Sequence, residues 1–152
     1  MKKGWIVFAM VFVLGIGLTS GWAAARGMMW RGSGGWGMGA PYNRLYDPKT
    51  LETISGDIVR VDRITPMKGM SHGIHLAIKT DQGEISVHLG PAWFVENQDI
   101  TIEPGDKVEV KGSRVTIQGK PAIIAASLRK GDETLELRDE NGVPVWSGMR
   151  RR

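Results

Sequence analysis

Two short segments near the middle of the chain alternate apolar and polar residues with a period of two. Residues 73–79 would place one set of side chains on each face of a strand, and residues 84–90 do the same. The four residues TDQG between them are typical of a tight turn, so the pattern predicts a β-hairpin. The apolar sets are Ile74, Leu76 and Ile78 in the first segment and Ile85, Val87 and Leu89 in the second.

The flanking sequence predicts further strands and one short helix. Residues 54–64 are rich in β-branched side chains and carry a glycine near their start, which indicates a long first strand with a bend. Residues 90–98 break the alternation after Pro91 and favour a short helix that buries aromatic side chains. The other predicted elements are a strand within residues 103–117, a strand over residues 119–131 and a hairpin over residues 134–146.

Three strands, a short helix and two more strands form the element order of the OB fold. The predicted fold class is therefore all-β: a five-stranded OB-type Greek-key barrel with a short helix between strands 3 and 4 and an extra C-terminal hairpin. The stretches SGDIVRV (55–61) and GDKVEVKG (105–112) resemble those of small exported bacterial OB-fold proteins. The resemblance covers about residues 52–130 and implies a periplasmic or secreted binding domain without a catalytic apparatus.

The N-terminal residues 1–25 are typical of a signal peptide. Lys2 and Lys3 precede an apolar run over residues 5–18, and an alanine stretch ends at Ala25. We expect cleavage near Ala25 and a periplasmic or secreted protein. An uncleaved membrane anchor is the alternative, although the run of 14 residues is shorter than the roughly 20 that span a bilayer as a helix.

The rest of the chain divides by composition. Residues 26–49 are rich in Gly, Met and Trp and predict a flexible lead, residues 50–146 hold the barrel, and residues 147–152 form a basic tail. The chain has no cysteine, which excludes disulfides, thiolate metal sites and C-x-x-C-H haem attachment.

The predicted hairpin brings two histidines together. Apolar positions have even numbers on one strand and odd numbers on the other, and the tight turn favours pairs whose residue numbers add up to 163. This register pairs His75 with His88 on the face opposite to the aliphatic residues and Lys79 with Glu84. Both imidazoles are then expected side by side on the outward face of the hairpin.

The same region supplies further soft ligands in the loop before the hairpin. The candidate metal ligands are His75, His88, His72, Met70 and Met67. Imidazole and thioether donors without a thiolate favour copper, especially Cu(I), so copper is the predicted cofactor. Some periplasmic copper chaperones are small OB barrels that hold Cu(I) with Met, His and a nearby Trp, and this chain resembles them in architecture. Its motif spacing differs from theirs, and no Trp lies in the same stretch.

Two less specific interpretations of this patch stay open: an ordinary polar face and a protein-docking surface. The string Gly69-x-Ser71-x-Gly73 matches a nucleophile elbow, but a proline precedes it and a period-two strand follows it, whereas the elbow joins a strand to a helix. We therefore expect loop residues here and no enzyme activity.

Charge and aromatic placement bear on the partners. Residues 45–149 carry 12 basic and 16 acidic side chains, so the excess positive charge lies at the chain ends. A nucleic-acid site on an OB barrel needs a basic groove and aromatic platforms. The outward face of the predicted hairpin carries neither. Single-stranded nucleic acid is therefore the least favoured ligand. The alternative partner is an envelope or redox protein complex, which would dock through Trp146 and the arginines at 150–152. The Trp and Arg residues at both ends of the chain also predict weak contact with a membrane surface.

Overall fold

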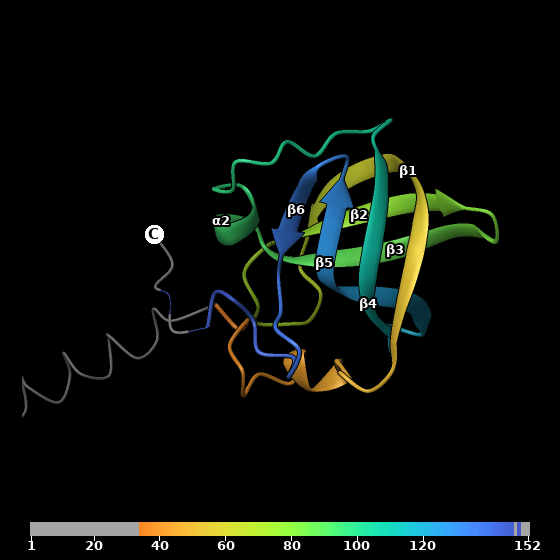
Figure 1. Ribbon diagram of the computed structural model, residues 1–152. Coiled ribbons are helices and arrows are strands. Elements are labelled where there is room, and N and C mark those ends of the chain that lie inside the picture. Colours follow the sequence, from red (N-terminus) through yellow and green to blue (C-terminus); the bar gives the residue numbers. More distant parts are fainter. Residues whose placement is uncertain (1–33, 148, 150–152) are drawn as a thin grey trace, which may run out of the picture. The chain divides into compact units, whose positions relative to one another are not determined.

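The computed structural model describes residues 34–147 and residue 149 (Figure 1). The predicted signal peptide and its cleavage site lie outside these residues, as does most of the basic tail. The elements in chain order are η1 (Asn43–Leu45), β1 (Leu51–Ile64), β2 (Gly73–Thr80), β3 (Gly83–Pro91), α2 (Ala92–Val95), β4 (Lys107–Ile117), β5 (Lys120–Lys130) and β6 (Glu133–Glu136).

The strands close into a five-stranded barrel. β1 pairs with both β2 and β4, β2 pairs with β3, and β4 pairs with β5, all antiparallel. β3 also runs parallel to β5, which completes the ring β1-β2-β3-β5-β4 (Figure 1). This is the strand arrangement of an OB barrel, with the short helix α2 after the third strand as the sequence predicts. The fold-class prediction is confirmed.

The bend in β1 allows this strand to serve two neighbours. Its first half pairs with β4 and its second half with β2, and Asp57 lies where the two ladders meet. At the preceding residue, Gly56, a Cβ atom would collide with the carbonyl oxygen of Lys79. Only glycine lets the two strands cross this closely, which explains the glycine near the start of the strand.

The β2–β3 hairpin has the predicted register over most of its length. Leu76 pairs with Val87 and His75 with His88, as expected from the sum of 163. A shift in register between Ile74 and His75 then places Ile74 opposite Gly90 instead of Leu89. This irregularity lies where Gly90 makes room for an aromatic ring, described below.

The C-terminal addition is smaller than the predicted hairpin over residues 134–146. β6 pairs with β5, and a single bridge joins Arg138 to Pro144 beyond it. Asp139 holds the intervening turn, because its Oδ1 accepts hydrogen bonds from the backbone N–H groups of Asn141 and Val143, both 2.9 Å away.

The second half of the expected flexible lead is packed against the barrel. Trp36 and Tyr42 are each 1% exposed, and Tyr46 is buried as well. The glycine content of this segment indicates flexibility, but three large aromatic side chains bury enough apolar surface to fix it. Within the described residues, no helix is both long and apolar enough to span a membrane.

Candidate functional site

The His75–His88 pair lies on adjacent strands at one end of the barrel. The ring centroids are 5.0 Å apart and the ring planes form an angle of 72°. The predicted adjacency is therefore present, but the predicted exposure is not, since His75 is 8% exposed and His88 5%. The Tyr42 ring stacks on His88 at a centroid distance of 6.1 Å. A residue from the predicted lead thus covers the pair.

Burial keeps both imidazoles neutral near pH 7. The pKa of His88 is lowered to about 4, mainly by desolvation and to a smaller extent by the neighbouring His75. Desolvation also lowers the pKa of His75, against the opposing effect of the Asp62 carboxylate. The Asp62 Oδ2 atom lies 3.9 Å from His75 Nδ1, which is too long for a hydrogen bond, and this nitrogen is buried without a partner.

The other three predicted ligands lie in the segment between β1 and β2. His72 is exposed, and its Nδ1 atom lies 3.4 Å from the Thr65 hydroxyl. Met67 and Met70 are half-buried and pack against the hydrophobic core. Among the residues that the structure describes, no three His, Cys, Asp or Glu side chains come close enough to share a metal ion. The predicted adjacency of the two strand histidines is thus confirmed, and a ligand role for the three loop residues stays a prediction.

An aromatic plug closes the same end of the barrel. We give this name to Trp36, Tyr42, Phe94 and Trp146. Trp36 contacts Tyr42 and Trp146 edge-on, at centroid distances of 5.0 and 6.4 Å, and Phe94 lies 5.3 Å from Trp146. The Trp146 indole N–H donates a hydrogen bond of 2.9 Å to the Trp36 carbonyl oxygen. Segments 110 residues apart in the sequence therefore meet over the barrel end.

Two glycines in the strands leave room for the plug. A Cβ atom at Gly73 would lie 2.5 Å from the Trp36 ring, and one at Gly90 would lie 2.8 Å from the Trp146 ring. Such distances are well inside van der Waals contact, so the two indoles pack directly on the backbone. Gly73 belongs to the G-x-S-x-G string, and the structure gives it a packing role. Ser71 accepts a hydrogen bond from the Trp36 indole through its backbone carbonyl, and its own hydroxyl is buried without a partner.

Arg138 is a buried cation beside the plug, and its local sequence does not predict this burial. It is 3% exposed, and its guanidinium lies 5.1 Å from the ring centroids of both Tyr46 and Trp146. It donates to the Ala125 carbonyl at 3.2 Å and to the Asn43 side chain at 3.4 Å. Burial lowers the pKa of this guanidinium, and no ion pair to it occurs in the part of the chain that the structure describes. In the sequence it stands in a polar stretch that resembles an ordinary turn.

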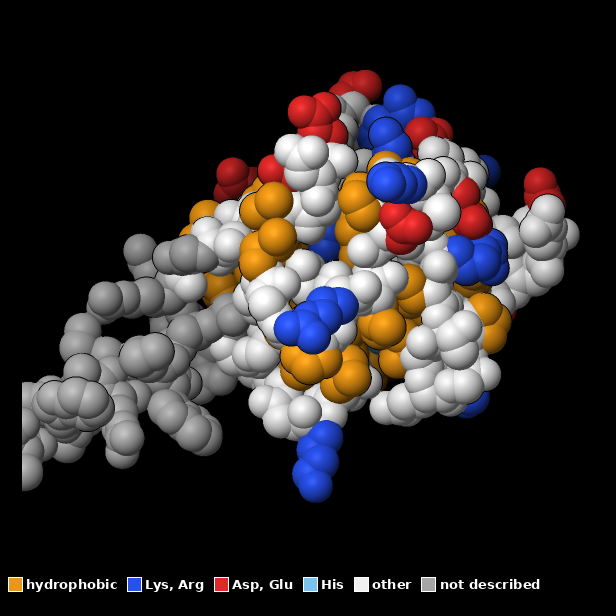
Figure 2. All heavy atoms as spheres, turned by 90° about the horizontal axis from the view of Figure 1, so that it is seen from below, with side chains coloured by type: hydrophobic (Ala, Val, Ile, Leu, Met, Phe, Trp, Pro, Cys, Tyr) orange, Lys and Arg blue, Asp and Glu red, His pale blue; other side chains and the backbone are white. Residues whose placement is uncertain are grey.

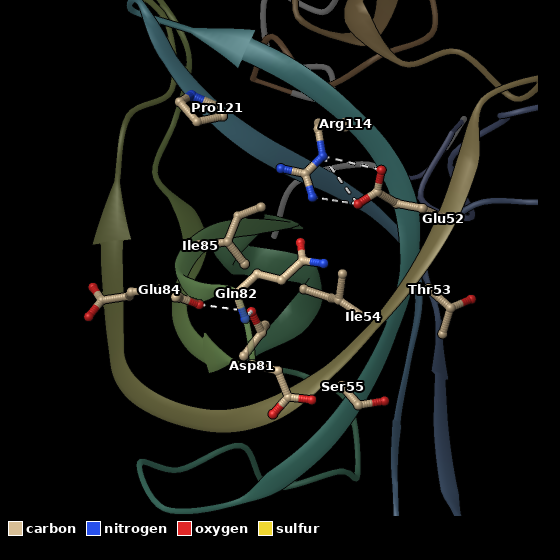
Figure 3. Close-up of a pocket in the computed structure, with 12 residues that line it drawn as sticks. Glu52, Thr53, Ile54, Ser55, Asp81, Gln82, Glu84, Ile85, Arg114 and Pro121 are labelled. Carbon is tan, nitrogen blue, oxygen red and sulfur yellow. Dashed lines mark hydrogen bonds and ion pairs between the residues drawn. The ribbon is translucent and has the colours of Figure 1, made fainter.

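The other end of the barrel is open. A pocket of about 520 Å³, here called the mouth pocket, lies between the start of β1, the tip of the β2–β3 hairpin and the β4–β5 corner (Figure 3). The side chains of Ile54 and Ile85 point into it, and Arg114 forms an ion pair with Glu52 on one side, with 2.6 Å between Nη2 and Oε1. This ion pair lowers the pKa of the Glu52 carboxyl through the hydrogen bond from Arg114.

The strands beside the mouth pocket are paired on one side only. The β1 residues before Asp57 pair with β4 alone, and the β3 residues before Ser86 pair with β2 alone. Each therefore presents an edge with unused backbone hydrogen-bonding groups. Such edges can accept an extended peptide as an added strand.

Topology and site together define a class: a small OB-fold domain whose barrel is plugged at one end by segments from outside it and open at the other. A model of the MamS/MamX magnetosome protein family matches residues 50–135, from the start of β1 to β6. The chain belongs to the MamS/MamX magnetosome protein family. The matched region contains His75, His88 and the mouth pocket, whereas Trp36 and Trp146 lie outside it.

Solved structures show only a general likeness to this barrel. A chain of a replication protein A heterotrimer bound to ssDNA is 15% identical with a TM-score of 0.41, and the match covers 55% of this chain and 59% of that one. The N-terminal domain of PriB from Thermoanaerobacter tencongensis is 13% identical with a TM-score of 0.38, over 56% of this chain and 99% of that one. Neither likeness bears on what this chain binds. Comparison with curated protein sequences finds no match.

Proposed function

We propose that this chain is a non-catalytic docking module of a magnetosome-associated protein assembly and that the mouth pocket receives an extended segment of a partner protein. The observation that carries the proposal is the pairing of an open pocket with two half-paired strand edges. Membership of the MamS/MamX magnetosome protein family supports the proposed place in a magnetosome-associated assembly. The aromatic plug closes one end of the barrel, so the opposite end stays free for a partner.

The pocket chemistry suits an extended peptide. Ile54 and Ile85 offer an apolar floor for one or two side chains, while the exposed Asp81, Gln82 and Glu84 supply a polar rim. Backbone groups on the free strand edges give hydrogen bonds that do not depend on the partner's side chains, and the pocket then selects which side chains fit.

Site-specific photo-crosslinking in the native bacterium tests this proposal. A photoreactive residue replaces Gln82 at the pocket rim or Glu133 at the start of β6; both positions are exposed and polar, so the second is a matched control. We expect one defined protein adduct from position 82, recovered with isolated magnetosomes, and none from position 133. Adducts that are the same from both positions, or the absence of the chain from the magnetosome fraction, would refute the proposal.

A second candidate function is binding of a soft metal ion, with copper as the predicted ion, by the His75–His88 pair. Two imidazoles that share a tetrahedral ion at metal–nitrogen distances of about 2 Å have ring centroids roughly 5 Å apart, and the observed separation is 5.0 Å. Both rings are held neutral at pH 7, so a metal ion would not have to displace protons. In this candidate function the pair would contribute two protein ligands, and an exogenous donor would complete the coordination.

Competition titrations with Cu(I) and Cu(II) test this candidate. We expect one high-affinity ion per chain in the wild type and in His72→Ala, which serves as the matched control because His72 lies in the exposed loop. The double variant His75→Ala/His88→Ala is expected to lose binding. Affinity that survives in the double variant would remove the histidine pair as the metal site.

A further inference from the structure

The tryptophans that the sequence predicts as exposed anchors are not available to a partner. Trp146 is fully buried, and Trp36 is 1% exposed. The two indoles pack on each other and on the backbone of the barrel, so the prediction of docking or membrane contact through these side chains is wrong. Recognition of a partner therefore has to use other groups, and the mouth pocket supplies them.

The mouth pocket carries negative charge that the domain does not neutralise. Three of its lining residues are acidic, namely Glu52, Asp81 and Glu84. Arg114 is the only cation among the described residues that line it. This guanidinium is committed to Glu52, because it donates from Nε to both carboxylate oxygens at 3.2 Å and from Nη2 to Oε1 at 2.6 Å. The two acids of the hairpin tip are left without this cation.

Asp81 is the less balanced of these two acids. Lys79 lies opposite Glu84 in the β2–β3 ladder, and Arg60 is within electrostatic reach of Glu84, although its hydrogen bond goes to Asp62. Asp81 lies in the turn, where it has no ladder partner, and it forms no ion pair within the part of the chain that the structure describes. Its carboxylate is therefore the charge most open to a partner.

The apolar floor of the mouth pocket lies between two kinds of charge. Figure 3 shows the Glu52–Arg114 ion pair on one side of Ile54 and Ile85 and the Asp81 carboxylate on the other. Glu84 points away from the two isoleucines in the same view. The pocket thus offers an apolar centre with a neutral ion pair at one end and an uncompensated carboxylate at the other.

The hairpin tip that carries Asp81 lies beside the free edge of β1. The last pair of the β1–β2 ladder joins Asp57 to Lys79, and beyond it β1 pairs with β4 alone. Figure 2 shows the tip projecting at the right edge of the face, with an acidic side chain on it. A strand added to the free edge of β1 therefore runs within reach of the Asp81 carboxylate.

We propose that the partner segment in the mouth pocket carries an aliphatic residue and, two positions away, a lysine or arginine. This inference rests on the proposed function of the pocket. In an added strand, residues two positions apart point to the same face and lie about 7 Å from each other. The aliphatic side chain packs on Ile54 and Ile85, and the cation pairs with Asp81. A segment with an acid at that position meets a like charge, so the pocket discriminates against it.

The photo-crosslink from position 82 also gives access to the partner's sequence. Mass spectrometry of the adduct identifies the crosslinked segment, which is then synthesised as a peptide and titrated against the purified chain. Asp81→Lys reverses the charge at the hairpin tip. Asp132→Lys is the matched control, because Asp132 is likewise an exposed aspartate in a tight turn, the one between β5 and β6.

We expect the mapped segment to contain a lysine or arginine two residues from an aliphatic residue. Its Kd should rise about tenfold in Asp81→Lys, since an attractive surface pair becomes a repulsive one, and should stay within about twofold in Asp132→Lys. Glu in place of the peptide's cation should restore the affinity of Asp81→Lys.

The failure of this inference can be told apart from the failure of the docking function. A mapped segment without the cation, or the same Kd for both charge-reversed variants, would overturn the inference and leave the docking function in place. The lack of a defined adduct from position 82 would overturn the docking function, and the inference would fall with it.

Discussion

Acid should destabilise this protein through protonation of His88. In the folded chain the pKa of His88 is lowered to about 4, whereas in the unfolded chain it returns to its ordinary value of 6.5. Between these two values the unfolded state binds a proton that the folded state rejects. Stability is therefore fully present above pH 6.5 and is lost as the pH falls toward 4.

The magnitude follows from the displacement of the pKa. At about 1.4 kcal/mol for each pKa unit, a change from 6.5 to about 4 corresponds to about 3 kcal/mol of unfolding free energy. Small domains are stable by about 5–15 kcal/mol in total, so this loss is large enough to measure by urea unfolding. The buried neighbour His75 adds an effect of the same sign, because its pKa is lowered too.

Urea unfolding of the wild type and of His88→Gln at pH 7, 5.5 and 4.5 isolates the contribution of His88. Gln cannot take up a proton, so we expect the stability difference between the two proteins to change by roughly 2–3 kcal/mol in favour of the variant between pH 7 and 4.5. The lowered carboxyl pKa of Asp106 remains in both proteins and cancels in the difference. Parallel stability curves for the two proteins would refute the assignment of a suppressed pKa to His88.

Three further predictions concern the plug and are measured by the same unfolding assay. Trp36→Ala removes a fully buried indole and should cost about 3–5 kcal/mol; a cost below 1 kcal/mol would mean that the segment is not packed. Gly73→Ala places a methyl group 2.5 Å from the Trp36 ring and should cost about 1–3 kcal/mol, whereas Gly39→Ala, where a Cβ atom meets nothing within 4 Å, should have little effect; equal effects would contradict the close packing. Tyr42→Phe removes a hydroxyl that is buried without a partner and should leave stability unchanged or raise it by about 1 kcal/mol; a clear loss would reveal a hydrogen bond to that hydroxyl.

The barrel is predictable from sequence because its determinants are local. The period-two pattern of the hairpin and its tight turn fix which residues lie opposite each other, so the pairs of His75 with His88 and of Lys79 with Glu84 follow. Gly56 marks the bend of the first strand for a similarly local reason, the crossing of one neighbouring strand.

The environment of the histidines is not predictable in this way, because it depends on segments distant in the chain. Tyr42 covers His88, and Trp36 is held in place by Trp146, yet nothing in the local sequence around these residues indicates their partners. The burial of Arg138 has the same origin, since its two aromatic neighbours also come from outside the barrel strands. A face that the hairpin alone would leave in solvent is therefore interior in the complete domain.

The hydrogen bond between Trp146 and Trp36 ties the two ends of the domain together. A truncation at either end therefore removes part of the plug. A fragment limited to residues 50–135 keeps every barrel strand but loses both indoles and Tyr42. Its two imidazoles would then face water, their affinity for protons would return toward that of free histidine, and the fragment would be a poor substitute for the intact domain.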